Sequence, residues 1–93
     1  CQRERASYML RVRGNSMIDD GIRDGDYVLV EKRNNARDGE TVVAMIQDGE
    51  ATLKKFYREK GRVRLQPANP DYEPIYPENV EIQGVVVGVV RQT

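Results

Sequence analysis

The sequence predicts an all-β domain, and three observations support this. The chain has 93 residues, which suits one small domain and is too short for two. Its apolar residues fall in short runs typical of strands, and Gly, Asp, Asn and Pro separate these runs. Only residues 16–20 suit a helical turn. We therefore expect six or seven strands in small, strongly bent sheets that form a partly open, barrel-like domain, with at most one short helical turn near Ser16.

The first half of the chain contains three runs that predict strands. Residues 8–13 (YMLRVR) form the first run. Residues 27–32 (YVLVEK) form the second, which follows a turn at Asp24-Gly25-Asp26. Residues 40–47 (ETVVAMIQ) form the third.

Turn residues delimit the strands that follow. Asp48-Gly49 is a strong hairpin signal because both residues tolerate a positive φ angle. Residues 51–58 then predict a strand, and Lys60-Gly61 turns the chain into another at residues 62–66.

The last third of the chain combines an irregular loop with a long strand. Prolines at positions 67, 70, 74 and 77 predict the loop, because proline lacks the N–H group that a strand ladder needs. Residues 80–91 predict a long apolar strand, in which Gly84 and Gly88 mark bends or bulges.

Composition excludes several classes of function. Fifteen basic residues balance fifteen acidic ones, whereas a nucleic-acid-binding surface usually has a clear basic excess. The chain contains no histidine, so no mechanism can use histidine as a base or as a metal ligand. We expect no metal and no cofactor.

Cysteine content and hydropathy indicate the compartment. Cys1 is the only cysteine and cannot form an internal disulfide, which fits a cytoplasmic protein. The longest apolar run, residues 85–90, is far shorter than the roughly 18 residues that a membrane span needs. We expect no signal peptide and no contact with a membrane.

A serine follows the first predicted strand, in the segment Gly14-Asn15-Ser16-Met17. Glycine permits a tight turn that lifts the serine hydroxyl away from the sheet, and amides at the start of a helical turn lack internal partners. Such amides can form an oxyanion hole beside a nucleophile. From the residues alone, Ser16 can equally cap a short helix. Met17, Ile18 and Ile22 are interpreted as core contacts.

A serine nucleophile without histidine needs another base, and lysine serves only when it is neutral. At its ordinary pKa, on the order of 0.1% of a lysine is neutral at physiological pH, and burial increases that fraction. Strand alternation places Thr52, Lys54 and Phe56 on one face. Phe56 then flanks Lys54 with apolar surface, and Thr52 can hydrogen-bond its amine. The alternative, also open from the residues, is that Lys54 and Lys55 are both solvated edge charges.

Several short motifs in series resemble the catalytic domain of LexA-like repressors, a self-cleaving family that includes UmuD-type proteins and several phage repressors. The matching stretches are RVRGNSM at 11–17, GIRDGD at 21–26, VLV at 28–30, GETVVA at 39–44, ATLKKF at 51–56, LQPANP at 65–70 and IQGVVVGVVR at 82–91. Together they cover most of residues 8–91 in order. A series of motifs is far more specific than any one of them.

The resemblance implies a serine peptidase that uses a serine–lysine pair. In this reading Ser16 attacks the scissile carbonyl, and neutral Lys54 takes its proton and later protonates the leaving amine. The backbone amides of Asn15 and Ser16 are implied as oxyanion donors. Four further residues are expected to organise the site: Met17, Asp24, Asp26 and Thr52. Lys55 is not expected to be catalytic.

The resemblance also implies partners. We expect a homodimer formed largely through the last strand, whose apolar edge carries Val85, Val86, Val87, Val89 and Val90. The structural alternative is an ordinary buried strand. A RecA–single-stranded-DNA filament is implied as the coprotease that stimulates cleavage in the DNA-damage (SOS) response. Operator DNA is implied as a partner only through an N-terminal domain.

We expect residues 1–93 to form a single peptidase and dimerisation domain. In the family the cleaved bond, commonly Ala-Gly, lies in a linker upstream of this domain, after a DNA-binding domain. Only seven residues precede the first predicted strand here, without an Ala-Gly pair, and we expect linker and DNA-binding domain to be absent. The alternatives are a UmuD-like polymerase-accessory protein, a non-catalytic dimerisation module, and a signal-peptidase relative, which would need a membrane anchor.

Overall fold

The computed structural model describes residues 6–47 and 49–92, and their secondary structure is almost entirely β. Cys1 and the Asp48 half of the predicted hairpin turn lie outside these residues. The elements are β1 (Ser7–Arg11), the 3₁₀ turn η1 (Ile18–Asp20), β2 (Tyr27–Lys32), β3 (Thr41–Ile46), β4 (Glu50–Glu59), β5 (Arg62–Gln66) and β6 (Val80–Val90). The predicted all-β class and the single helical turn near Ser16 are both confirmed.

The six strands form one antiparallel sheet in the order β1-β2-β6-β3-β4-β5. We expected several small sheets, and the structure has a single one. It does not close into a barrel, because β1 and β5 are the first and last strands of this order and do not pair with each other.

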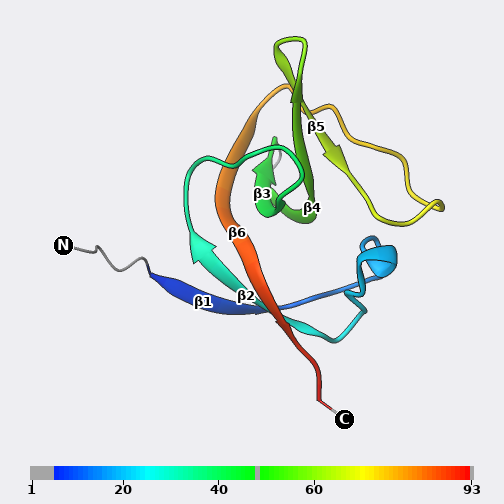
Figure 1. Cartoon of the computed structure of the whole chain (residues 1–93). Coiled ribbons are helices and arrows are strands. Elements are labelled where there is room, and N and C mark those ends of the chain that lie inside the picture. The colour runs from blue at the N-terminus through cyan, green and yellow to red at the C-terminus, as the bar shows by residue number, and fades with distance from the viewer. Residues whose placement is uncertain (1–5, 48, 93) are drawn as a thin grey trace.

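β6 joins the two halves of the sheet. Its first part, Val80 to Val85, pairs with β3, and its second part, Gly84 to Val90, pairs with β2. The pairing register shifts once against each partner, at Leu29/Val30 and at Val43/Ala44. Irregularities of this kind bend a strand. β6 accordingly runs as one long curved strand with β1 and β2 near one end and β3 and β4 near the other (Figure 1).

Gly84 pairs with Lys32 of β2, and the β2 backbone leaves no room for a side chain at this position. A Cβ atom at this position would lie 2.8 Å from the carbonyl oxygen of Glu31 and closer still to the Val30 side chain. Only glycine fits this crossing, which agrees with the predicted bend.

The β4–β5 hairpin is closed by the two residues predicted to turn the chain. Lys60 and Gly61 have φ angles of 50° and 78°, and Glu59 pairs with Arg62 across the turn. Positive φ at both central residues is the requirement of a type I′ turn, whose twist matches that of the flanking strands.

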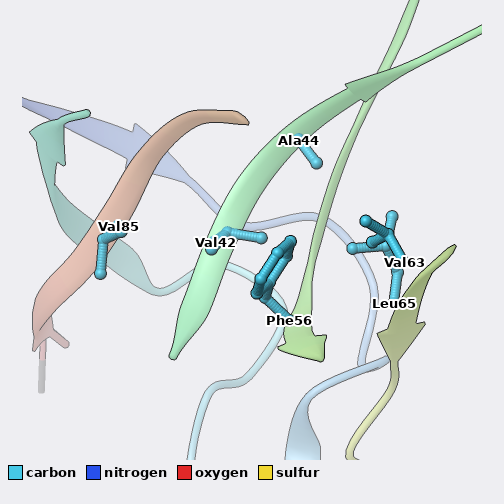
Figure 2. Packing of buried hydrophobic residues seen from close by; sticks show 6 residues of the cluster. All are labelled: Val42, Ala44, Phe56, Val63, Leu65 and Val85. Carbon is cyan, nitrogen blue, oxygen red and sulfur yellow. The ribbon is translucent and has the colours of Figure 1, made fainter. Parts of the chain in front are cut away.

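Two hydrophobic clusters make up the core, one in each half of the sheet. The first comprises Val42, Ala44, Phe56, Val63, Leu65 and Val85. The Phe56 ring lies between Val42 and the side chains of β5 (Figure 2). The second comprises Met17, Ile22, Val28, Val30 and Val43. Met17 and Ile22 are thus core residues, as predicted, and they anchor the segment that carries Ser16.

Candidate functional site

Ser16 lies in the turn between β1 and η1, directly before the buried side chain of Met17. Asp24, predicted to organise this turn, accepts a hydrogen bond from the Gly14 amide at 2.6 Å. The Asp24 amide in turn donates to Asn15 Oδ1 at 3.0 Å. These two bonds tie the serine turn to the turn that precedes β2.

The proline-rich loop after β5 holds the serine turn from its other side. The Ala68 amide donates to the Ser16 carbonyl at 2.8 Å, and the Asp19 amide donates to the Ala68 carbonyl at 2.7 Å. Asn69 Nδ2 donates to the Asn15 carbonyl at 2.7 Å. Asn69 was not predicted from the sequence to be a site residue. Its one signal was its place between Pro67 and Pro70 in a motif of the family.

The amides of Asn15 and Ser16 remain available in this arrangement. Within residues 6–47 and 49–92, neither amide donates a hydrogen bond to a protein acceptor. Both belong to the turn that presents the Ser16 side chain.

Lys54 is a buried charged residue of β4, with 8% of its surface exposed. Val42 lies opposite it on β3, and Phe56 lies two residues further along the same face of the strand. Lys54 Nζ donates to Thr52 Oγ1 at 2.7 Å and to Ser16 Oγ at 3.4 Å. The structure therefore brings together the serine, the lysine and the threonine that the sequence analysis selected.

The environment of Lys54 favours the neutral amine. Burial lowers the pKa of Lys54 from its ordinary value of 10.5, and the negative charge of Glu50 opposes that shift. The neighbouring Lys55 follows Lys54 on β4 and therefore lies on the other face of the strand. Its amine pairs with Asp20 at 3.3 Å, and about a third of its side chain is exposed.

A cleft of about 340 Å³ opens beside Ser16 and Lys54. β1 and the residues after it form one wall, and β3 with the first half of β4 forms the other. Its lining residues are Leu10, Arg11, Val12, Arg13, Ser16, Val28, Val43, Ala51, Thr52, Leu53 and Lys54. Six of these eleven residues are apolar, and the other five, among them Arg11 and Arg13, bring polar or charged groups to the cleft.

Asp26, directly before β2, is 3% exposed. It accepts hydrogen bonds from the Arg23 amide at 2.7 Å and from Arg91 Nε and Nη2 at 2.9 and 2.8 Å. The Arg91 guanidinium, followed by the Arg23 amide, lowers the pKa of Asp26 to about 2. Arg91 also donates to the Gly21 carbonyl at 2.8 Å. These bonds connect the residue that follows β6 to the segment between η1 and β2. The sequence analysis placed Arg91 in a motif but gave it no role.

The valines of β6 divide between core and surface. Val85 is buried in the first core cluster, and Val86 packs against the second. Val87, Val89 and Val90 are 55%, 43% and 47% exposed. In the described part of the chain, β6 pairs with β3 only as far as Val85, so one side of its last residues has no strand partner.

Residues 6–47 and 49–92 contain no group of three or more Cys, Asp or Glu side chains close enough to hold a metal ion. No helix within the same residues is both long enough and apolar enough to cross a membrane.

Comparison with known proteins identifies the family. Residues 1–87 match the family model described as Peptidase S24-like. This chain belongs to the Peptidase S24-like family. Similar S24-like relatives are the LexA repressors of Desulfitobacterium hafniense (strain DSM 10664 / DCB-2) and Bacillus subtilis (strain 168), which are 61% and 56% identical over 84 residues. The LexA repressor of Novosphingobium aromaticivorans is 55% identical over 87 residues.

These matches cover 90%, 90% and 91% of the S24-like chain but only 41%, 41% and 37% of the relatives. The chain therefore spans about two fifths of the length of these LexA repressors. The resemblance to LexA-like repressors drawn from the sequence motifs is confirmed.

Proposed function

We propose that this chain is the catalytic core of a LexA-like repressor of the DNA-damage (SOS) response, a serine peptidase that uses Ser16 and Lys54. One observation carries the proposal. A lysine amine with little access to water lies 3.4 Å from a serine hydroxyl, at the wall of a cleft that suits a peptide. Burying a lysine costs stability, and titratable groups perturbed by burial cluster at functional sites.

The proposed reaction begins with neutral Lys54. Its Nζ accepts the Ser16 proton while Oγ bonds to the scissile carbonyl carbon, and the carbonyl π electrons move to the oxygen. The resulting tetrahedral intermediate collapses, the C–N bond breaks, and Lys54 gives the proton to the leaving amine. Water then hydrolyses the acyl-serine, with Lys54 as the base. Thr52 Oγ1, at 2.7 Å, holds the lysine amine in place during these transfers.

The negative oxygen of the intermediate needs donors, and the free amides of Asn15 and Ser16 are the proposed ones. Backbone amides in this role are already fixed before the reaction, so they stabilise the developing charge without reorganisation. Met17, Asp24 and Asp26 support them. Met17 anchors the turn in the core, Asp24 binds the Gly14 amide, and Asp26 fixes the next turn through the Arg23 amide.

The proposed substrate is the linker of the repressor itself, at the family's Ala-Gly bond. Small residues on both sides of that bond suit a cleft lined by Leu10, Val43 and Ala51. We further propose that a RecA–single-stranded-DNA filament stimulates cleavage and that operator DNA is bound by a separate N-terminal domain of the repressor. The proposed site of action, with these partners, is the cytoplasm.

A cleavage assay in trans tests the proposal. The substrate is a synthetic peptide that carries an Ala-Gly bond within the linker sequence of a LexA repressor. We expect Ser16→Ala and Lys54→Ala to reduce cleavage by at least a thousandfold with folding intact, on the scale typical of a lost nucleophile or base. The matched control is Lys55→Ala, which should retain cleavage. Activity in Ser16→Ala, or loss in Lys55→Ala with activity in Lys54→Ala, would contradict the proposal.

We also propose that the domain dimerises through β6. The exposed Val87, Val89 and Val90 and the unpartnered side of the strand support this. Met9 and Leu29, which are paired across β1 and β2, add exposed apolar surface in the same half of the sheet. Val85 belongs to the core, so we leave it out of the proposed interface.

A further inference from the structure

Asn69 makes an unusual contact with the serine turn. Its Nδ2 donates to the carbonyl oxygen of Asn15 at 2.7 Å, across 54 residues of sequence. The same oxygen accepts a weaker bond from the Ile18 amide at 3.3 Å. Two donors thus fix the direction of one carbonyl group, the one that immediately precedes the Ser16 amide.

The direction of that carbonyl determines the direction of the Ser16 N–H group. A peptide unit is planar, and in its trans form the C=O and the following N–H point to opposite sides. The described residues contain no cis peptide bond. Holding the Asn15 carbonyl toward Asn69 therefore holds the Ser16 N–H on the opposite side of the peptide unit, away from Asn69.

The Asn69 side chain is itself held in one orientation. Its Oδ1 accepts a hydrogen bond from the Asp71 amide at 2.8 Å, so a rotation of the carboxamide by half a turn would lose both bonds. Pro67 and Pro70 limit the backbone freedom of the loop on either side. The Ala68 amide fixes the next carbonyl, that of Ser16, at 2.8 Å.

We infer that Asn69 is a positioning residue for catalysis, which aims the Ser16 amide at the oxyanion through the Asn15 carbonyl. This inference rests on the proposed peptidase function. Asn69 does not touch the substrate. Negative charge develops on the carbonyl oxygen when Ser16 Oγ bonds to the scissile carbon and the proton passes to Lys54. In this proposal the Ser16 amide is then already held in the orientation that donates to this oxygen.

Two substitutions separate this role from simple support of the loop. Asn69→Asp removes the donor to Asn15 and keeps an acceptor for the Asp71 amide, whereas Asn69→Ala removes both. Asn34→Asp, in the exposed loop after β2, makes the same chemical change away from the site and serves as the control. Each variant is assayed with the Ala-Gly linker peptide for kcat, KM and the pH dependence of kcat, and its thermal stability is measured.

We expect kcat to fall roughly ten- to hundredfold in both Asn69 variants. A donor that points in the wrong direction stabilises the oxyanion less, but the loss in kcat should be smaller than when the donor is removed altogether. KM should stay within about twofold, because only the transition state is affected. The midpoint of the pH profile should not move, because Lys54 is untouched. The Asn34→Asp control should match the wild type.

The inference is overturned if Asn69→Asp keeps the wild-type kcat, or if only Asn69→Ala loses it, since the loop bond to Asp71 would then be the important one. It is also overturned if the loss in kcat disappears at a temperature well below the melting temperature of the variant. Failure of the wild type to cleave the peptide is a separate result, which would refute the proposed function instead.

Discussion

Lys54 is the residue at which folding and proposed function conflict. It lies opposite Val42 on β3 and two residues before Phe56 on the same face of β4, and the hydrogen-bond partners of its buried amine are two hydroxyl groups. Among the described residues, no carboxylate forms an ion pair with this amine, and Glu50 acts on it only through its charge. The lowered pKa is the consequence, and it supplies the neutral amine that a serine nucleophile needs.

Replacing this lysine should therefore stabilise the domain. We expect Lys54→Met to raise the free energy of unfolding at pH 7 by about 1 kcal/mol, because a buried charge with incomplete compensation is exchanged for an apolar side chain of similar volume. The unfolded chain holds the lysine proton more tightly than the folded one, so wild-type stability rises with pH through the folded-state pKa. The gain from Lys54→Met should shrink accordingly as the pH approaches 10.5.

Urea denaturation at pH 7 and pH 10 measures this effect, with Lys55→Met as the control. A variant that is less stable than the wild type at both pH values would show that the amine is adequately paired in the fold.

Local patterns in the sequence predicted only part of the site. Thr52, Lys54 and Phe56 share a face because a strand alternates. The pairing of Ser16 with Lys54, 38 residues apart, was expected from the resemblance to LexA-like repressors and not from a local pattern. Asn69 and Arg91 were given no role from the sequence, because their partners lie 54 and 65 residues away. No local pattern specifies which loop will meet which turn.

At the scale of elements, the pairing of β6 with β2 depends on the absence of a side chain at Gly84. We expect Gly84→Ala to lower the free energy of unfolding by roughly 1–3 kcal/mol, because the new methyl group would overlap Val30 and the Glu31 carbonyl. Gly88→Ala is the matched control, since the nearest atom to its Cβ would be Leu29 Cβ at 3.8 Å, an ordinary contact. Chemical denaturation of both variants measures the difference. Equal stability of the two variants would refute the close contact between Gly84 and the backbone of β2.

The Arg91–Asp26 pair fastens the end of β6, and its contribution should depend on pH. The folded-state pKa of Asp26, about 2, lies below its ordinary value of 3.8. The stabilisation is therefore complete above about pH 4 and is lost as the pH falls toward 2. We expect Arg91→Gln to be less stable than the wild type at pH 7 and the difference to narrow below pH 4.

Urea denaturation across this range is the measurement, and Arg11→Gln, an exposed arginine of β1, is the control. A difference between wild type and Arg91→Gln that stays constant from pH 7 to pH 2.5 would exclude Asp26 as the titrating partner.

The sequence predicted the strands well, because turn residues and alternation mark their ends to within two or three residues. The first strand ends at Arg11, two residues before the predicted limit, and β6 ends at Val90, one residue before it. The exchange of partners along β6 could not be predicted. It depends on bulges and on the packing of two separate clusters, which are properties of the assembled sheet.

For the molecule as a whole, the exposed valines at the end of β6 form the proposed dimer interface. We expect Val87→Glu together with Val89→Glu to shift the isolated chain from dimer to monomer, because like charges would face each other across a self-pairing interface. Sedimentation velocity over a range of concentrations measures this, with Tyr72→Glu, in the exposed loop before β6, as the control. A wild type that stays monomeric throughout would exclude this dimer.

The titration of the Lys54 amine tests the central claim most directly. NMR can follow the Cε and Nζ shifts of Lys54 with pH, beside the pH dependence of peptide cleavage. We predict that Lys54 loses its proton below 10.5, with a midpoint that coincides with that of cleavage. A Lys54 amine that keeps its proton up to pH 10.5 or above, or a cleavage rate that is flat across the titration of Lys54, would contradict the account.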